Sequence, residues 1–148
     1  MTILQKIKFI VQSQLPSLDL VLDYLEYCHE PWISPQDWSC CQIVLAEGFT
    51  NAVRHAHRDL SAEHLIEIHL TLFSHGIEIK IWDEGKPFDL LRYSQNLLRS
   101  PNSFELGGRG IFLMRTIATH LSYERGTDER NCLFIVRQFS TEEECQNS

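Results

Sequence analysis

The sequence has no long hydrophobic stretch. No segment approaches the roughly 18 consecutive apolar residues that a membrane-spanning helix needs. The opening residues MTILQKIKFIVQSQL contain too short an apolar run for a signal peptide. We therefore expect a soluble protein with neither a membrane span nor a secretory leader.

Positive charge is also scarce. Thirteen Lys and Arg residues stand against 20 Asp and Glu residues, which gives a formal net charge of −7. Non-specific binding to DNA or RNA needs a basic excess that displaces counterions from phosphates, so this charge argues against it. An acidic surface instead suits basic or neutral protein partners. The five cysteines show no C-x-x-C spacing and no disulfide framework, which fits a reduced cytoplasm.

Two common nucleotide-binding fingerprints are missing. The chain has no G-x-x-x-x-G-K-[ST] phosphate loop, and no G-x-G-x-x-G follows a predicted strand. It does have 43% hydrophobic residues in 148, which is enough for one globular domain with a substantial core. We place that domain at residues 1–139 and a polar tail at residues 140–148.

Hydrophobic periodicity predicts both strands and helices. Alternating apolar residues predict five strands, at residues 6–11, 65–73, 77–82, 121–124 and 131–139. The 3.6-residue period predicts a first helix from Pro16 to about Glu30. A second, long helix begins at the capping box Ser34–Asp37 and carries Glu47 and Asn51. A third helix opens from the glycines at residues 107–110 and continues to Leu121.

One face of the long helix carries a polar stripe. Glu47, Asn51 and His55 step by four residues and therefore lie on the same side of the helix. A carboxylate and a carboxamide one turn apart on a half-buried helix could hold a magnesium ion and activate a hydroxyl or a water. The alternative is the ordinary polar side of an amphipathic helix. For this stretch alone that alternative is the better one, and two glycine motifs downstream reverse the preference.

The first glycine motif follows directly from an apolar strand. Asp83 ends that strand, and Gly85 lets the backbone approach a flat ligand, so the carboxylate is suited to accept a hydrogen bond from an exocyclic amine. A plain acidic turn is the alternative. Residues 90–106 have no clean period, and a mobile lid is the functional interpretation of that segment.

The second glycine motif, Gly107–Gly110, opens directly into a helical period. Free backbone N–H groups at the start of a helix, with no side chains in the way, form an anion site for phosphate. The alternative is a flexible helix cap.

The fixed order of these motifs resembles the Bergerat-fold ATP-binding superfamily, and within it the small anti-sigma-factor serine/threonine kinases. The resemblance spans residues 3–139. The motifs similar to the N box, the two glycine boxes and the closing glycine-threonine pair are Glu47-x-x-x-Asn51-Ala52-x-x-His55, Asp83-x-Gly85-x-Pro87-Phe88-Asp89, Gly108-x-Gly110-Ile111 and Gly126-Thr127.

The resemblance implies an α+β fold. It would be a two-layer α/β sandwich with helices on one face of a mixed, mostly antiparallel sheet, and with ATP between the Asn51 helix and the lid. Glu47 would be the catalytic general base, Asn51 the ligand of Mg²⁺, and Asp83 the reader of the adenine amine. The implied nucleotide-binding residues are Asn51, His55, Asp83, Gly85, Pro87, Gly108, Arg109, Gly110 and Thr127. His55 and Arg109, like Arg54, either neighbour the phosphates or face solvent.

The implied activity is that of a protein kinase that uses ATP and Mg²⁺. It would phosphorylate a serine or threonine of a small anti-sigma-factor antagonist and would bind a sigma factor or a similar target. It would be a cytoplasmic homodimer that contacts neither nucleic acid nor membrane. A non-catalytic, ATP-dependent switch that sequesters its partner is the alternative. A detached histidine-kinase catalytic domain is a third reading, less favoured because the sequence shows no histidine-bearing helix pair.

Two positions depart from the family pattern. Gly48 stands in mid-helix where the family commonly has alanine, at a cost of roughly 1 kcal/mol of helix stability. We expect close helix packing to compensate. Residues Phe104–Gly107 lack the basic or hydroxyl residue that several kinase members carry there, which bears on the efficiency of phosphoryl transfer more than on nucleotide binding.

Overall fold

Alternating apolar residues build a five-stranded sheet in the computed structural model, which describes residues 2–56, 63–86 and 108–140, without the side chains of residues 55, 56, 108 and 109. The spatial order of the strands is β1-β2-β3-β5-β4, and every neighbouring pair is antiparallel. The strands are β1 (Ile3–Gln12), β2 (Leu65–Phe73), β3 (Gly76–Asp83), β4 (His120–Arg125) and β5 (Asn131–Gln138).

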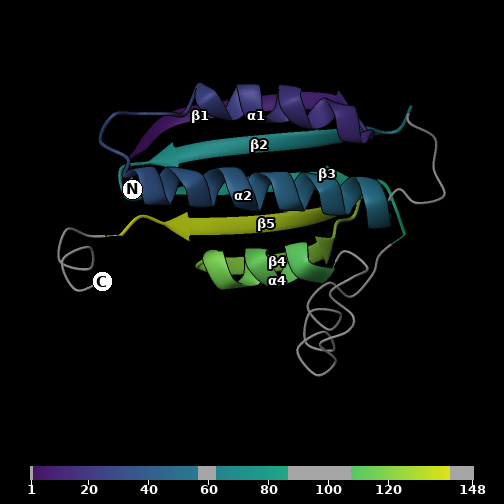
Figure 1. Cartoon of the computed structure of the whole chain (residues 1–148). Coiled ribbons are helices and arrows are strands. Elements are labelled where there is room, and N and C mark those ends of the chain that lie inside the picture. The colour runs from purple at the N-terminus through teal and green to yellow at the C-terminus, as the bar shows by residue number, and fades with distance from the viewer. Residues whose placement is uncertain (1, 57–62, 87–107, 141–148) are drawn as a thin grey trace.

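The helices all lie on one face of this sheet (Figure 1). Helix α2 runs along β3 and β5, α1 covers the β1 side, and α4 covers the β4 side. The described helical segments are the 3-10 turn η1 (Leu15–Ser17), α1 (Leu18–Glu26), α2 (Pro35–Asn51), the π-helical turn η2 (Ala52–Ala56) and α4 (Gly108–Ile117). The predicted two-layer α/β sandwich is therefore confirmed. The described sheet is wholly antiparallel, whereas the resemblance implied a mixed, mostly antiparallel one.

The core lies between the helices and the sheet. Every second residue of the central strands points toward the helices, as the period of a strand requires. The fully buried residues of β2, β3 and β5 on this face include Ile66, Ile68, Leu70, Ile79, Ile81 and Ile135. The helices contribute Val21, Leu25, Val44, Leu45, Phe49, Ile111 and Met114. Among the described helices, none is long and apolar enough to span a membrane.

The beginning of α2 matches the predicted capping box. The backbone N–H of Asp37 donates to Ser34 Oγ at 3.1 Å, and Pro35 occupies the first turn, where its missing N–H costs nothing. Ser34 Oγ in turn donates to Asp37 Oδ2 at 3.0 Å. This cap fixes where α2 starts, and hence which residues reach its other end.

Helix α1 is shorter than the sequence predicted. It ends at Glu26, and the N–H groups of Tyr27, Cys28 and His29 donate to carbonyls three residues back instead of four. This tightened turn buries Cys28 in the core. Pro31 disfavours helical geometry at Glu30, the residue before it, and the tightened turn ends the helix earlier still, at Glu26.

Close packing at Gly48 is confirmed as the reason for a glycine within α2. A Cβ atom at this position would lie 2.7 Å from Ile81 Cδ1 and 3.2 Å from Leu133 Cδ2. Both neighbours belong to the sheet beneath the helix. The missing side chain therefore lets α2 approach β3 and β5, which compensates for the lower helix propensity of glycine.

A buried ion pair ties α2 to the end of the sheet. Arg137 Nη2 of β5 donates to Asp37 Oδ1 at 2.9 Å, and its Nη1 donates to the carbonyl of Ile117 at the end of α4 at 2.8 Å. Asp37 is 2% exposed and also accepts from the Ser140 N–H. Three elements of the helical layer and the sheet thus meet at one guanidinium group.

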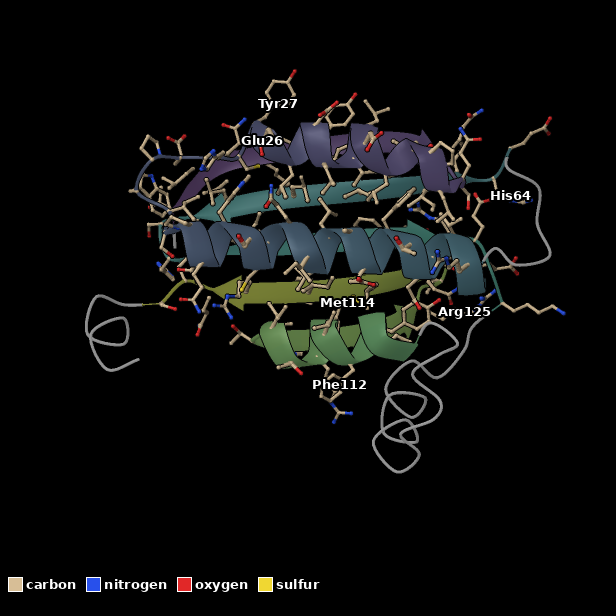
Figure 2. The ribbon with its side chains drawn as sticks, viewed as in Figure 1. Glu26, Tyr27, His64, Phe112, Met114 and Arg125 are labelled. Atoms are coloured by element: carbon tan, nitrogen blue, oxygen red, sulfur yellow. The ribbon has the colours of Figure 1, made fainter. Side chains whose placement is uncertain are left out.

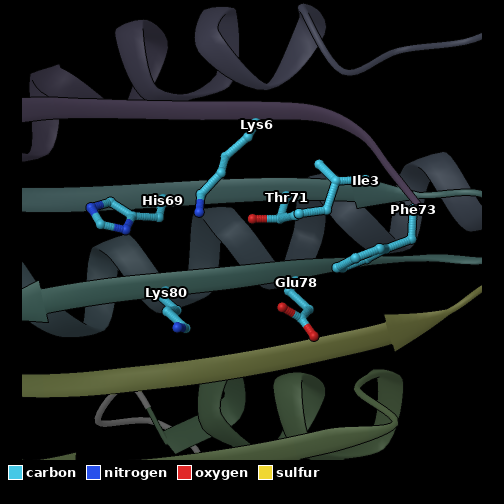
Figure 3. A pocket seen from close by; sticks show the side chains of 7 residues that line it. All are labelled: Ile3, Lys6, His69, Thr71, Phe73, Glu78 and Lys80. Atoms are coloured by element: carbon cyan, nitrogen blue, oxygen red, sulfur yellow. The ribbon is translucent and has the colours of Figure 1, made fainter. Parts of the chain in front are cut away.

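The other face of the sheet carries a shallow hollow of about 120 Å³ (Figure 3). Lys6, Thr71 and Glu78 share one rung across β1, β2 and β3, and His69 and Lys80 share the next rung with Lys8. These residues alternate with the core residues, so they point away from the helices. The hollow is consequently separate from the stripe on α2.

Candidate functional site

The polar stripe of α2 lies at the end of that helix. Glu47 is half-buried, and Asn51, the last α-helical residue, is only 7% exposed. Asn51 Oδ1 is inaccessible to solvent and has no hydrogen-bond partner within the described part of the chain. A buried acceptor without a partner is costly and is uncommon in folded proteins. An amide oxygen in this position is suited to bind a cation or a water that a ligand brings.

The chain changes helical geometry directly after Asn51. Residues Ala52–Ala56 form a π-helical turn, a rare conformation that often occurs at functional sites. The side chain of Arg54 in this turn is exposed. His55 belongs to the same turn by its backbone, but its side chain lies outside the described structure. The turn contacts β3, the strand that ends in Asp83.

The carboxylate of Glu47 lies against the beginning of α4. A Cβ atom added to Gly110 would collide with Glu47 Oε2 and would lie 2.9 Å from its Cδ. Gly108 and Gly110 belong to the first turn of α4, where backbone N–H groups have no partner within the helix. The glycine therefore makes room for Glu47 beside these N–H groups, and α2 packs along α4 in the same region. Figure 2 shows Met114 of α4 directed toward α2, whereas Phe112 points outward.

Asp83 is the centre of a buried hydrogen-bond network. It is 2% exposed, and its Oδ1 accepts from the Gly85 N–H at 3.0 Å and from Asn131 Nδ2 at 2.8 Å. Its Oδ2 accepts from the Tyr123 hydroxyl at 2.9 Å. This carboxylate is thus held by residues of β4 and β5 as well as by its own turn. The arrangement is more specific than the plain acidic turn that the sequence left open.

Charge and burial act together on Tyr123. Burial raises the pKa of its hydroxyl group well above the ordinary value, and the Asp83 charge and hydrogen bond raise it further. Tyr123 therefore stays protonated and remains a donor to Asp83 at any pH near neutrality. A cation lies close by, since Arg125 Nη1 donates to Asn131 Oδ1 at 3.4 Å.

The remaining predicted site residues are placed as follows. Gly85 is buried, and its backbone N–H donates to the Asp83 carboxylate. Thr127 is exposed in the turn between β4 and β5, and it is Asn131 that reaches Asp83 from this end of the sheet. The backbone of Arg109 lies in α4, whereas its side chain lies outside the described structure. Pro87 and the proposed lid at residues 90–106 lie outside the described residues.

Tyr123 and Asn131 were missed at the level of sequence. The strand period does carry a signal, because residues 121, 123 and 125 of β4 and residues 131, 133 and 135 of β5 face the same side of the sheet as Asp83. Asn131 and Asp83 are direct partners across β3 and β5. Without the strand order, however, nothing in the sequence shows that these two residues meet.

Comparison with known proteins identifies the family of the chain. A family model described as a histidine kinase-like ATPase domain matches residues 12–137. The serine-protein kinase RsbW of Bacillus subtilis (strain 168) is 32% identical over 82 residues, covering 51% of this chain and 50% of that protein. The serine-protein kinase RsbW of Bacillus licheniformis is 25% identical over 104 residues, covering 66% and 65%. The chain thus spans about half to two thirds of the length of these curated relatives.

Two solved structures share the fold. A chain in the crystal structure of the SiaB-SiaC complex from Pseudomonas aeruginosa gives a TM-score of 0.59 at 14% identity, covering 93% of this chain and 91% of that one. The blue-light activated histidine kinase of Erythrobacter litoralis EL346 gives 0.52 at 18% identity, covering 75% and 33%. These likenesses concern architecture alone, whereas the family model covers most of the sequence. The chain belongs to the histidine kinase-like ATPase domain family, as its resemblance to the Bergerat-fold superfamily predicted.

Proposed function

We propose that this chain is an ATP-dependent serine/threonine protein kinase that acts as an anti-sigma factor in a partner-switching system. The observation that carries the ATP site is the buried, unpartnered amide oxygen of Asn51, one helical turn beyond Glu47. The assignment as a kinase is supported by similarity to proteins named serine-protein kinases. The anti-sigma role is supported by the resemblance of the motifs to that group of kinases.

The described residues can be given distinct tasks in such a site. Asp83 would accept a hydrogen bond from the adenine amine, and the first-turn N–H groups of α4 would donate to phosphate oxygens. Asn51 Oδ1 would hold Mg²⁺, which when bound neutralises charge on the phosphates. Pro87, His55, Arg109 and Thr127 stay proposed nucleotide neighbours.

Glu47 is proposed as the general base. Its carboxylate lies against Gly110 at the start of α4, beside the N–H groups that would cradle the phosphates. An acceptor next to the phosphate site could take the proton of an incoming serine or threonine hydroxyl as the oxygen attacks phosphorus. It would not be needed for holding ATP in the ground state.

The proposed protein substrate is a small anti-sigma-factor antagonist, and the proposed second partner is a sigma factor or a similar regulatory protein. A net charge of −7 suits partners with basic or neutral contact surfaces. A homodimer, with no direct contact to nucleic acid or membrane, is part of the same proposal.

The test is single-turnover phosphoryl transfer to candidate antagonist proteins at saturating ATP. Glu47→Gln keeps size and hydrogen bonding, so we expect ATP affinity to be nearly unchanged while transfer falls by about 10² to 10⁴. Glu26→Gln, on the exposed face of α1, is the matched control and should transfer like wild type. If wild type binds ATP and a partner but transfers nothing, the chain is the non-catalytic switch.

A further inference from the structure

The Asp83 carboxylate has one acceptor position left. An ionised carboxylate offers about four lone-pair positions, two on each oxygen. Both positions of Oδ1 are used, by the Gly85 N–H and by Asn131 Nδ2. On Oδ2, the Tyr123 hydroxyl uses one position. Within the described structure, a single acceptor position on Oδ2 therefore remains for a ligand.

The amide of Asn131 is fixed in one orientation. Its Nδ2 donates to Asp83 Oδ1 and to the carbonyl of Gly85, both at 2.8 Å, and its Oδ1 accepts from Arg125. A flipped amide would place its oxygen against two acceptors and its nitrogen against a cation. The side chain is fully buried, so no water would relieve such a mismatch. Asn131 thus joins Asp83 Oδ1 to the backbone of the glycine turn through hydrogen bonds from one amide group.

Tyr123 holds the second oxygen of the carboxylate. Because the carboxylate is planar, the two bonds at Oδ1 and the Tyr123 hydroxyl bond to Oδ2, 2.9 Å long, together resist rotation about the Cβ–Cγ bond. The Tyr123 bond also takes one of the two positions on Oδ2, so a ligand is directed to the other. Arg125, two residues further along β4, lies at the end of the sheet near the end of α2 (Figure 2), so this network faces the region of the proposed ATP site.

We propose that Tyr123 and Asn131 are the positioning residues that make the base site selective for an amino group. Together with the Gly85 N–H, they occupy three of the four acceptor positions of Asp83 and leave the fourth, on Oδ2, for a ligand. An exocyclic amine can donate to that position, whereas a carbonyl in the same place meets another acceptor. The proposal rests on the ATP site proposed above and assigns its base selectivity to two residues outside the recognised motifs.

The measurement that isolates positioning is a ratio of affinities. Inosine triphosphate differs from ATP in carrying a carbonyl where adenine carries the amine, so it does not use the free position on Oδ2. Without the Tyr123 hydroxyl, one of the three bonds that hold the carboxylate in place is lost and both positions on Oδ2 are open to water. ATP should then bind more weakly, while inosine triphosphate should bind as before or slightly better. Loss of structural support alone would weaken both nucleotides equally.

The experiment is calorimetry of ATP and of inosine triphosphate, each with Mg²⁺, on wild type, Tyr123→Phe and Asn131→Ala. We expect wild type to prefer ATP by at least about tenfold and the preference to shrink by about three- to tenfold in each variant, the worth of one hydrogen bond. Tyr24→Phe is the matched control, because this tyrosine loses the same hydroxyl but stacks on Phe9 of β1, the strand at the opposite edge of the sheet from β4. Its preference should equal that of wild type.

Each failure is distinguishable. A wild-type chain that binds neither nucleotide overturns the proposed ATP site itself. A wild type that binds both nucleotides equally overturns amine selection and leaves the ATP site standing. An unchanged ratio in folded Tyr123→Phe or folded Asn131→Ala, as judged by circular dichroism, overturns the positioning role of that residue.

Discussion

The side chain of Glu47 fills the space that a side chain at position 110 would need. A Cβ atom on Gly110 would overlap the carboxylate oxygen Oε2 of Glu47, although the two residues are 63 positions apart in a chain of 148. No left-handed backbone conformation explains this glycine, because its φ angle falls outside that region. Contact with Glu47 of the first motif is therefore one reason why position 110 of the second glycine motif needs a glycine.

That relationship predicts a non-additive pair of mutations. In the wild-type background, Gly110→Ala should lower the free energy of unfolding by about 1 to 2 kcal/mol, since overpacking outweighs the gain in helix propensity. In a Glu47→Ala background the same change should be neutral or stabilising by up to about 1 kcal/mol. Urea denaturation of the four proteins forms a double-mutant cycle. Equal effects in both backgrounds would show that the contact is not what demands glycine.

Asn51→Ala should separate stability from binding. Because Asn51 Oδ1 has no partner in the described structure, its removal should leave the midpoint of thermal unfolding unchanged or slightly raised. Binding of ATP in the presence of Mg²⁺ should nevertheless weaken by at least about tenfold. Titration calorimetry with Mg²⁺ and with EDTA measures the second effect.

Asn131→Ala serves as the stability control for that experiment. It removes another buried amide, which makes hydrogen bonds at 2.8 Å to both Asp83 and Gly85, so it should destabilise the fold by about 1 to 3 kcal/mol. If Asn51→Ala destabilises as much as Asn131→Ala, then Asn51 is a structural residue and its assignment to the metal is wrong.

Arg137→Met should be among the most destabilising single substitutions. It leaves Asp37 buried without its guanidinium partner and removes a donor from the carbonyl of Ile117, at a cost of about 3 to 5 kcal/mol. Arg130→Met is the control, because Arg130 is partly exposed and pairs with exposed Asp128 and with Glu67, so its loss should cost at most about 1 kcal/mol. Chemical denaturation of both variants decides; similar midpoints would mean that the buried pair contributes little.

Two buried thiols should make the fold sensitive to alkali. Burial raises the pKa of Cys28 to about 11 and, together with the nearby Asp37 charge, raises that of Cys41 to about 12. Above the ordinary thiol pKa of about 9, the unfolded chain therefore loses protons that the folded chain keeps. Stability should fall as pH rises from about 9 toward 11.

Denaturation at stepped pH values checks this sign. A variant with both Cys28→Ala and Cys41→Ala should lose less stability between pH 9 and pH 11 than wild type does, whatever its stability at neutral pH. Cys40→Ala, which alters the adjacent, less buried thiol, is the matched control. Parallel pH profiles for the double variant and wild type would refute the role of the thiols.

Much of the fold follows from local sequence rules. The capping box at Ser34, the alternation in residues 65–73 and the turn before Ile77 each report on neighbouring residues, and all three were predicted correctly. The end of α1 was predicted four residues too far. Apolar residues at helical spacing continue to Leu25, but periodicity does not describe the tighter turn that follows, in which Cys28 is buried.

The candidate site, in contrast, depends mainly on contacts between residues that are distant in the sequence. The resemblance of the motifs to a known family predicted that Glu47, Asn51, Asp83 and Gly110 belong to one site, and the structure brings Glu47 against Gly110. The contacts that hold Asp83 come from β4 and β5, across 40 and 48 residues of sequence. They depend on strand order, which places β5 between β3 and β4. Local patterns carry no information about that order.

Asp83, Asn131 and Arg125 sit on a single rung across β3, β5 and β4. A slip of one residue along β5 would turn Asn131 to the opposite face of the sheet and remove it from the carboxylate. A chain misaligned in this way would still contain helices and strands, and its circular dichroism would look nearly native. Under the role proposed for Asn131, its preference for ATP over inosine triphosphate should then shrink. Nucleotide discrimination would in that case serve as an assay of strand registration, and it could score refolded or mutant preparations that spectroscopy alone would pass.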